Sequence, residues 1–308
     1  MIEARQLTKR YGEKTAVDGV DFTVRPGAVT GFLGPNGAGK STTMRMIIGL
    51  DAPTSGSVTV NGRRYAQHSA PLHEVGALLE ARSIHPGRSA FDHLMALAYT
   101  HGISRARVTE VIELTGLGSV ARKRAGAFSL GMGQRLGTAA ALLGDPQTVM
   151  LDEPVNGLDP EGVLWIRNLL TGLAAEGRTV FVSSHLMGEI ALVADHLIVV
   201  GRGRVLADTT VRDLVEQAGG DTVTVAAGDP AELRRVLAGP GVEITGQPGS
   251  EQLIVTGLPA REIGLKAAAH GLALFELTPR TVSLEEAFME LTKESVEYHA
   301  TSALGRAA

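Results

Sequence analysis

The chain has 308 residues, a hydrophobic fraction of 44% and a formal net charge of -4 at pH 7. This length and hydrophobic content are enough for two buried cores and exclude wholesale disorder, while the negative balance excludes a general electrostatic attraction to nucleic acid. The lack of cysteine excludes disulfides and thiolate metal sites. The charged start, MIEARQLTKRYGEK, is unlike a signal peptide, and the apolar runs are too short to predict a membrane span.

Apolar, β-branched runs recur along the first two thirds of the chain: VDFTV, VTGFL, SVTV, TVMLDEP, TVFVSSH and HLIVVGRGRVL. Helical stretches separate several of them, which predicts an α/β domain with a largely parallel core sheet. Residues 88–144 have helical patterns and no convincing strand, so we expect a helical subdomain inserted in this core.

The pattern changes near residue 219. The segments DTVTVAAGDPAELRRVL, EQLIVTGLPAREIGLKAAAHG and LALFELTP predict a small C-terminal α+β domain of the ferredoxin-like kind. We therefore place the domains at 1–219 and 220–308. Ser283 and Glu286 form a capping box that begins the last predicted helix, and its apolar face comprises Leu284, Ala287, Phe288 and Leu291.

The segment GPNGAGKST follows the run VTGFL and precedes the helical run STTMRMIIGL. It fits the phosphate-loop pattern G-x-x-x-x-G-K-[ST] at every fixed position. Glycines let backbone N–H groups surround a triphosphate, and the dipole of the following helix favours the anion. Lys40 is expected to reach the β- and γ-phosphates and Ser41 to bind Mg²⁺. The predicted nucleotide-binding residues here are Gly34, Pro35, Asn36, Gly37, Ala38, Gly39, Lys40, Ser41 and Thr42.

The run TVMLDEP ends in two carboxylates, Asp152 and Glu153. An acidic pair after a strand is by itself typical of a surface turn. In a chain with a phosphate loop, the pair predicts nucleotide hydrolysis: Asp152 holds Mg²⁺ through its water shell, and Glu153 orients or polarises the attacking water.

Three further segments lie after the phosphate loop: FSLGMGQRL precedes the acidic pair, and NGLD and VSSH follow it. In this order the motifs resemble those of the ATP-binding-cassette (ABC) ATPases over residues 2–217. The sequence is most similar to the nucleotide-binding subunits of drug and antibiotic exporters. The resemblance implies that Tyr11 stacks on adenine and that His185 contacts the γ-phosphate and the catalytic water. It also implies that Ser129 and Gly131 contact the γ-phosphate of the opposite subunit, and that Asp159 lies in the loop that joins the two sites. A core tyrosine and an ordinary histidine after a strand are the alternatives for Tyr11 and His185.

The resemblance implies a mechanism and partners. Two copies of the chain would close around ATP and Mg²⁺ as a homodimer, although a heterodimer with a second ATPase stays open. ATP hydrolysis would power export by a separate membrane permease that holds the chain at the cytoplasmic face of the membrane. The transported substrate cannot be inferred from this chain.

Two motifs depart from the family pattern. The signature, usually L-S-G-G-Q, reads Phe128-Ser129-Leu130-Gly131-Met132, which keeps the serine and the second glycine. Met132 replaces the glutamine that usually ends the signature motif, and methionine lacks the amide donor. Glu80, in VGALLEARSIHPG, stands where the family has a glutamine, and we expect it to ligate Mg²⁺ and to couple the site to the permease. The alternative is a solvated loop glutamate.

Other functions were weighed against this one. A GTPase would need an N-K-x-D element, which does not occur, and a small-molecule kinase is the related alternative. A soluble ABC ATPase that acts on ribosomes or DNA is the remaining alternative. The basic segment Arg122-Lys123-Arg124 is interpreted as a solvated face, with contact to an acidic permease loop as the sharper option.

Overall fold

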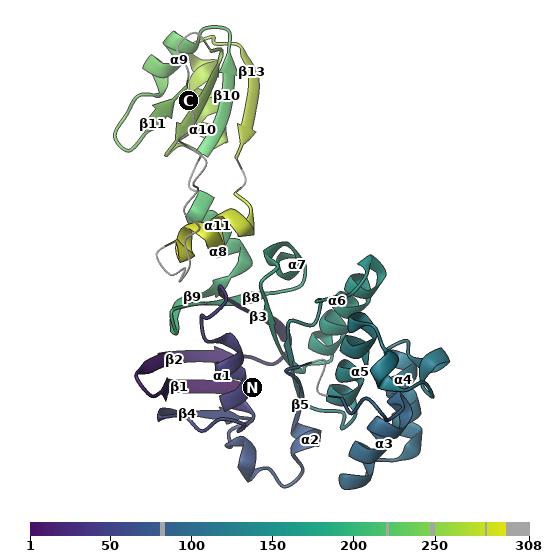
Figure 1. Ribbon diagram of the computed structural model, residues 1–308. Coiled ribbons are helices and arrows are strands. Elements are labelled where there is room, and N and C mark those ends of the chain that lie inside the picture. Colours follow the sequence, from purple (N-terminus) through teal and green to yellow (C-terminus); the bar gives the residue numbers. More distant parts are fainter. Residues whose placement is uncertain (81–83, 220–221, 247–249, 281, 294–308) are drawn as a thin grey trace, which may run out of the picture. The chain divides into compact units, whose positions relative to one another are not determined.

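The computed structural model describes residues 1–80, 84–219, 222–246, 250–280 and 282–293 (Figure 1). Two compact units are present: Met1–Val211 together with Leu291–Lys293, and Arg212–Glu290. The predicted domain boundary between 219 and 220 adjoins residues 220 and 221, which lie outside the described residues.

A six-stranded sheet forms the centre of the first unit, in the order β5-β6-β7-β3-β8-β9. Its strands pair in parallel except for β8 and β9, which are antiparallel. The predicted parallel core sheet is therefore confirmed, with β5 as a member that we did not predict. The strands are β3 (Ala28–Leu33), β5 (Val75–Leu78), β6 (Thr148–Asp152), β7 (Thr179–Ser184), β8 (His196–Gly201) and β9 (Arg204–Thr210).

A separate antiparallel sheet has the order β2-β1-β4, with β1 at Ile2–Tyr11, β2 at Lys14–Val24 and β4 at Ser55–Val60. The runs VDFTV and SVTV belong to this second sheet, whose separation from the parallel sheet was not predicted from the sequence. The reason is local: a tight turn with Gly12 at a φ of 57° joins β1 to β2 and folds the second strand back onto the first.

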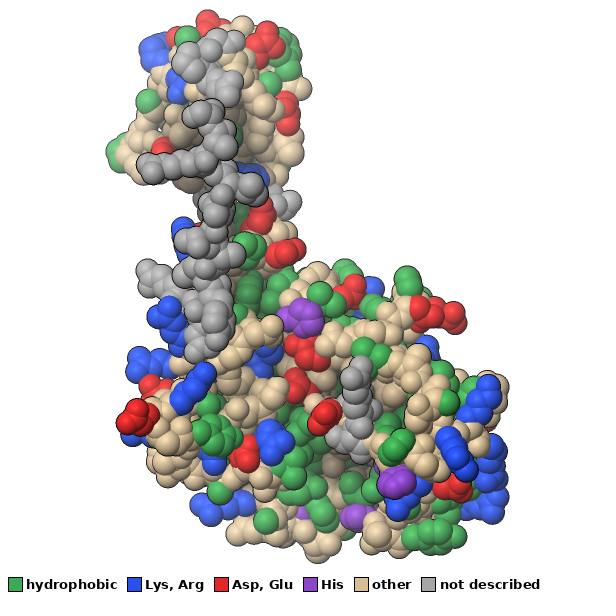
Figure 2. All heavy atoms as spheres, in the orientation of Figure 1, with side chains coloured by type: hydrophobic (Ala, Val, Ile, Leu, Met, Phe, Trp, Pro, Cys, Tyr) green, Lys and Arg blue, Asp and Glu red, His purple; other side chains and the backbone are tan. Residues whose placement is uncertain are grey.

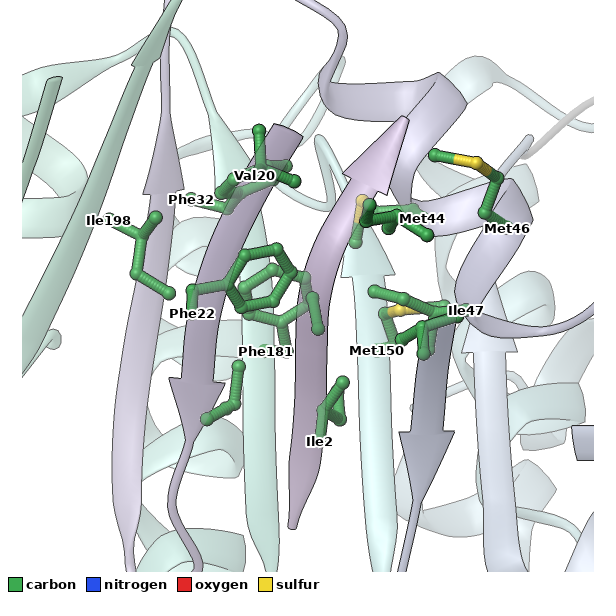
Figure 3. Close-up of a cluster of buried hydrophobic side chains, with 14 of the residues drawn as sticks. Ile2, Val20, Phe22, Phe32, Met44, Met46, Ile47, Met150, Phe181 and Ile198 are labelled. Carbon is green, nitrogen blue, oxygen red and sulfur yellow. The ribbon is translucent and has the colours of Figure 1, made fainter. Parts of the chain in front are cut away.

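The two sheets enclose the main core. The ring centroid of Phe32 on β3 lies 5.8 Å from that of Phe22 on β2 and 5.0 Å from that of Phe181 on β7 (Figure 3). Met44 and Ile47, from the helix that follows the phosphate loop, are buried in the same cluster. The helix is thereby anchored on one face of the six-stranded sheet, while α5 and α6 cover the other face (Figure 1).

The helices of this unit are α1 (Lys40–Ile47), α2 (Pro71–Glu74), α3 (Ala90–Thr100), α4 (Arg105–Leu114), α5 (Leu130–Leu142), α6 (Pro160–Ala175) and α7 (Met187–Ala191). Single 3₁₀ turns occur at Tyr65–Gln67, Gly118–Val120 and Ala125–Ala127. Serines at positions 89, 104 and 129 cap α3, α4 and α5, because each Oγ accepts an N–H from the first turn. Between 88 and 144 the regular elements are thus helices. In the described part of the chain, no helix is long and apolar enough to cross a membrane.

The second unit has a four-stranded antiparallel sheet in the order β11-β12-β10-β13. Helices α9 and α10 make the two crossovers, which gives the β-α-β-β-α-β order of a ferredoxin-like domain. The predicted capping box is confirmed, since Ser283 N donates to Glu286 Oε2 at 2.9 Å and Glu286 N donates to Ser283 Oγ at 3.1 Å. The elements are α8 (Val211–Gly219), β10 (Thr222–Ala227), α9 (Pro230–Leu237), β11 (Glu243–Thr245), β12 (Gln252–Thr256), α10 (Ala260–Ala269), β13 (Leu274–Pro279) and α11 (Leu284–Thr292).

Candidate nucleotide site

Most of the predicted site residues follow the carboxyl ends of neighbouring parallel strands. Gly34 follows β3, Asp152 ends β6, and His185 follows β7. In the sheet register, Asp152 pairs with Ser183 and Leu33 pairs with Ser184, so these strand ends meet at one edge. Ligands of open α/β sheets bind outside this edge.

The phosphate loop has glycine where a side chain does not fit. A Cβ atom on Gly34 would lie 2.4 Å from the carbonyl oxygen of Val200, and one on Gly39 would lie 2.5 Å from that of Ala16. Gly37 and Gly39 also have φ angles of 82° and 98°, a region that favours glycine. Gly39 precedes the first turn of α1 and has no side chain to cap it, so the turn's N–H groups remain for an anion.

The Lys40 ammonium group is held inside the same loop. Its side chain is buried, and Nζ donates to the carbonyl oxygen of Gly34 at 2.6 Å and to that of Pro35 at 3.4 Å. Burial lowers the pKa of Lys40, while the nearby carboxylates of Glu153 and Asp152 oppose this shift. A desolvated cation beside backbone donors is a favourable site for phosphate oxygens.

A hydroxyl and a carboxylate lie together beside the loop. Ser41 Oγ donates to Asp152 Oδ2 at 2.8 Å, and Ser183 donates to the other carboxylate oxygen. Hard oxygen donors of this type suit Mg²⁺. The sequence analysis had not singled out Ser183, although its place in VSSH at the end of a parallel strand was a usable signal.

Glu153 has an unusual backbone and a defined partner. Its φ angle is 51°, and its N–H is shared between the carbonyl oxygen of Ser183 at 3.2 Å and Ser183 Oγ at 3.0 Å. His185 Nδ1 lies 2.6 Å from Glu153 Oε2. A neutral His185 with its proton on Nδ1 donates to this oxygen and leaves Nε2 free to face a ligand.

The signature residues contact a different part of the chain. Ser129 is exposed at the N-terminus of α5, where its Oγ accepts the N–H of Met132 at 3.2 Å. Gly131 packs against the loop after Glu153, since a Cβ atom on it would lie 2.6 Å from the carbonyl oxygen of Gly157. Among the described contacts, neither Ser129 nor Gly131 touches the phosphate loop of its own chain. Asp159 caps α6 by accepting the N–H of Gly162 at 2.8 Å.

Tyr11 ends β1 and is 48% exposed as a residue, so the alternative of a core tyrosine was wrong. Its hydroxyl donates to Asp51 Oδ2 at 3.1 Å, and Arg45 Nε donates to the same oxygen at 2.8 Å. Lys9 Nζ lies 4.9 Å from the ring centroid and covers one face. The ring is thus fixed at its rim and on one side. Asp51 is a neighbour that the sequence analysis missed, because nothing in the linear spacing links it to Tyr11.

Glu80 lies just beyond β5, the strand next to β6, and is exposed. Its metal role stays a prediction. The segment Arg122-Lys123-Arg124 is exposed too, and Figure 2 shows basic side chains gathered on the side of the helical subdomain where α4 lies. The guanidinium of Arg122 stacks 4.2 Å above the ring of Phe91.

Comparisons with known proteins agree on one family. A family model described as ABC transporter matches residues 17–156, and a domain of unknown function (DUF8746) matches residues 221–285. The bacitracin transport ATP-binding protein BcrA of Enterococcus faecalis is 34% identical, over 94% of this chain and 96% of that protein. The linearmycin resistance ATP-binding protein LnrL of Bacillus subtilis is 33% identical, over 95% of this chain and 98% of that protein. The dimeric structure of MJ0796, a bacterial ABC transporter cassette, superposes with a TM-score of 0.64 at 25% identity, over 68% of this chain and 98% of that chain.

Proposed function

The chain belongs to the ATP-binding subunits of ABC transporters, and on this premise we propose that its ATPase activity powers the export of a drug or an antibiotic through a separate membrane permease. Two chains would enclose two ATP molecules, with Mg²⁺ at each site. The permease would hold the pair at the cytoplasmic face of the membrane.

One observation carries the two-chain site. Lys40, Asp152 and Glu153 gather at one sheet edge, whereas Ser129 is exposed on α5 and has no described contact with them. A single chain therefore offers a complete phosphate cradle and, elsewhere, a serine-capped helix N-terminus. A second copy can bring its own helix to the cradle, so that ATP becomes part of the interface.

The residues of the cradle divide the hydrolytic work. Lys40 and the loop N–H groups bind the β- and γ-phosphates, which stabilises charge on the transferred group. Glu153 accepts a hydrogen bond from the attacking water, and His185 holds the Glu153 carboxylate in place at 2.6 Å. The water oxygen bonds to the γ-phosphorus and gives a proton to the Glu153 carboxylate, while the bond to the β–γ bridging oxygen breaks and ADP and inorganic phosphate leave.

The donor set also fits Mg²⁺. Ser41 Oγ and Asp152 Oδ2, now 2.8 Å apart, would hold the ion directly or through water, and Glu80 is the further carboxylate proposed at this edge. When bound, the ion neutralises part of the phosphate charge.

The permease is tested by capture from membranes. The bait is the full chain with Glu153→Gln, which should bind ATP without turnover and stay in the closed dimer. We expect ATP-dependent capture of a protein with several spans of about 20 apolar residues. The matched control, Lys40→Ala, should not respond to ATP.

Three results would contradict the proposal at different points. Undiminished ATPase activity of Lys40→Ala would refute the phosphate site. A Glu153→Gln chain that stays monomeric in sedimentation with saturating ATP would refute the two-chain site. Capture of only ribosomal or DNA-bound proteins would favour the soluble ABC ATPase over the exporter subunit.

A further inference from the structure

Gln134 is a buried amide on α5 that contacts the backbone of Glu153. Its side chain is 5% exposed, and Nε2 donates to the carbonyl oxygen of Glu153 at 3.1 Å. The other amide atom, Oε1, is buried and has no hydrogen-bond partner among the described residues. Burying an unpaired amide oxygen costs free energy, and methionine would fill a similar volume without that cost. Packing alone therefore does not favour glutamine at position 134. The hydrogen bond that its Nε2 donates to Glu153 is the reason we infer for a glutamine here.

The bond acts on a backbone that needs support. Glu153 adopts a φ of 51°, which is unfavourable for a residue with a side chain and persists where the surroundings hold it. Ser183 accepts a hydrogen bond from the N–H of Glu153, and Gln134 donates a hydrogen bond to the carbonyl oxygen of Glu153. The two peptide groups that flank the Glu153 Cα are thus fixed from β7 on one side and from α5 on the other. This arrangement fixes the backbone from which the Glu153 carboxylate projects.

The same helix carries the residues expected to meet the partner's nucleotide. Ser129 caps α5, and Gln134 lies little more than one helical turn beyond it. Gly131, between them, packs against the carbonyl of Gly157, so the start of α5 and the loop after Glu153 are in contact twice. The hydrogen bond of Gln134 therefore links the first turns of this helix directly to the backbone of Glu153.

We propose that Gln134 is a positioning residue that couples the two ATP sites of the dimer. The γ-phosphate in one site engages Ser129 at the N-terminus of α5, and Gln134 on the same helix then sets Glu153 for hydrolysis in the other site. The inference rests on the proposed two-chain site. In each chain, binding of ATP at the site that its own Ser129 contacts thus positions its own Glu153 in the other site.

The first test separates positioning from folding and binding. Gln134→Met keeps the buried volume and removes the donor. We expect kcat for ATP to fall at least about 10-fold, while KM and the ATP-driven dimerisation of the Glu153→Gln background stay within about twofold. The matched control is Thr138→Val, which removes a buried hydroxyl one turn further along α5 whose described hydrogen bond goes to the Gln134 carbonyl oxygen. It should keep kcat within about twofold.

The second test asks for coupling between sites. In a mixed dimer, one chain carries Glu153→Gln, so its site holds ATP without turnover and only the other chain hydrolyses. Ser129→Ala in the hydrolysing chain alters only the silent site. At protein and ATP concentrations that keep every chain in the dimer, we expect it to lower turnover several-fold, and to have no further effect once that chain also carries Gln134→Met.

The outcomes separate the two proposals. Wild-type kcat in Gln134→Met, or fully independent effects of Ser129→Ala and Gln134→Met in the mixed dimer, would overturn the coupling role while leaving the ATPase intact. Loss of dimerisation in Gln134→Met would also overturn it, because the residue would then be structural. Failure of the proposed function itself is seen separately, as ATPase activity that survives Lys40→Ala.

Discussion

Gly131→Ala tests whether the start of α5 must lie against the loop that follows Glu153. The new Cβ atom would lie 2.6 Å from the carbonyl oxygen of Gly157, a backbone atom that cannot rotate away. Overpacking of this kind costs about 1–3 kcal/mol, and about 1 kcal/mol is regained because alanine favours the helix more than glycine. We expect a net loss of stability of at most about 2 kcal/mol, which lowers Tm by less than about 8 °C in a domain of this size.

The effect on catalysis should be larger than the effect on stability. Separating α5 from the loop moves Ser129 and Glu153 relative to each other, and a displacement near 1 Å can cost about 100-fold in rate. We therefore expect kcat to fall about 10- to 100-fold, measured as phosphate release at saturating ATP, with Tm measured by calorimetry. Gly172→Ala in α6 is the control, because nothing lies within 4 Å of its new Cβ, and it should keep kcat and gain about 1 kcal/mol of stability. A Gly131→Ala protein with wild-type kcat would refute the reasoning.

Three further predictions concern the nucleotide and the metal. Tyr11→Ala should raise KM for ATP about 5- to 150-fold because stacking contributes about 1–3 kcal/mol. Tyr11→Phe, which keeps the ring and loses the hydroxyl that bonds to Asp51, should keep KM within about threefold of the wild type. Equal KM values for the two variants would contradict the stacking role. Glu80→Ala should sharply lower Mg²⁺-dependent ATPase activity and raise the Mg²⁺ concentration needed for half-maximal rate, and wild-type turnover would contradict its role as a ligand. Burial lowers the pKa of Lys40, whereas bound phosphates stabilise its charged form. ATP binding should therefore take up protons at alkaline pH, and the affinity for ATP should fall as the pH rises through the lowered pKa. Calorimetry in two buffers of different ionisation enthalpy measures the proton uptake, and the same uptake in Lys40→Ala would contradict the prediction.

The sequence predicted the site best where function depends on adjacent residues. The phosphate loop is a single segment, so the glycines at 34, 37 and 39 and the cation at 40 could be assigned from spacing alone. Asp152 and Glu153 were assigned because they end a strand whose pattern is clear. The antiparallel placement of VDFTV and SVTV was missed, since an apolar run does not state which sheet it joins. Ser183, Asp51 and Gln134 were missed for the related reason that their partners lie far away along the chain.

The departure at Met132 gains a physical meaning from this arrangement. The side chain of Met132 has no amide group. Gln134, two residues further on, has one, and it donates a hydrogen bond to the carbonyl oxygen of Glu153. The backbone N–H of Met132 still serves the Ser129 cap, so the start of α5 keeps its shape. In the proposed two-chain site, we expect the substitution to weaken only contacts that the side chain at 132 would make with the partner's nucleotide. The proposed positioning of Glu153 depends on Gln134 and not on Met132, so loss of the amide at 132 is compatible with an active ATPase.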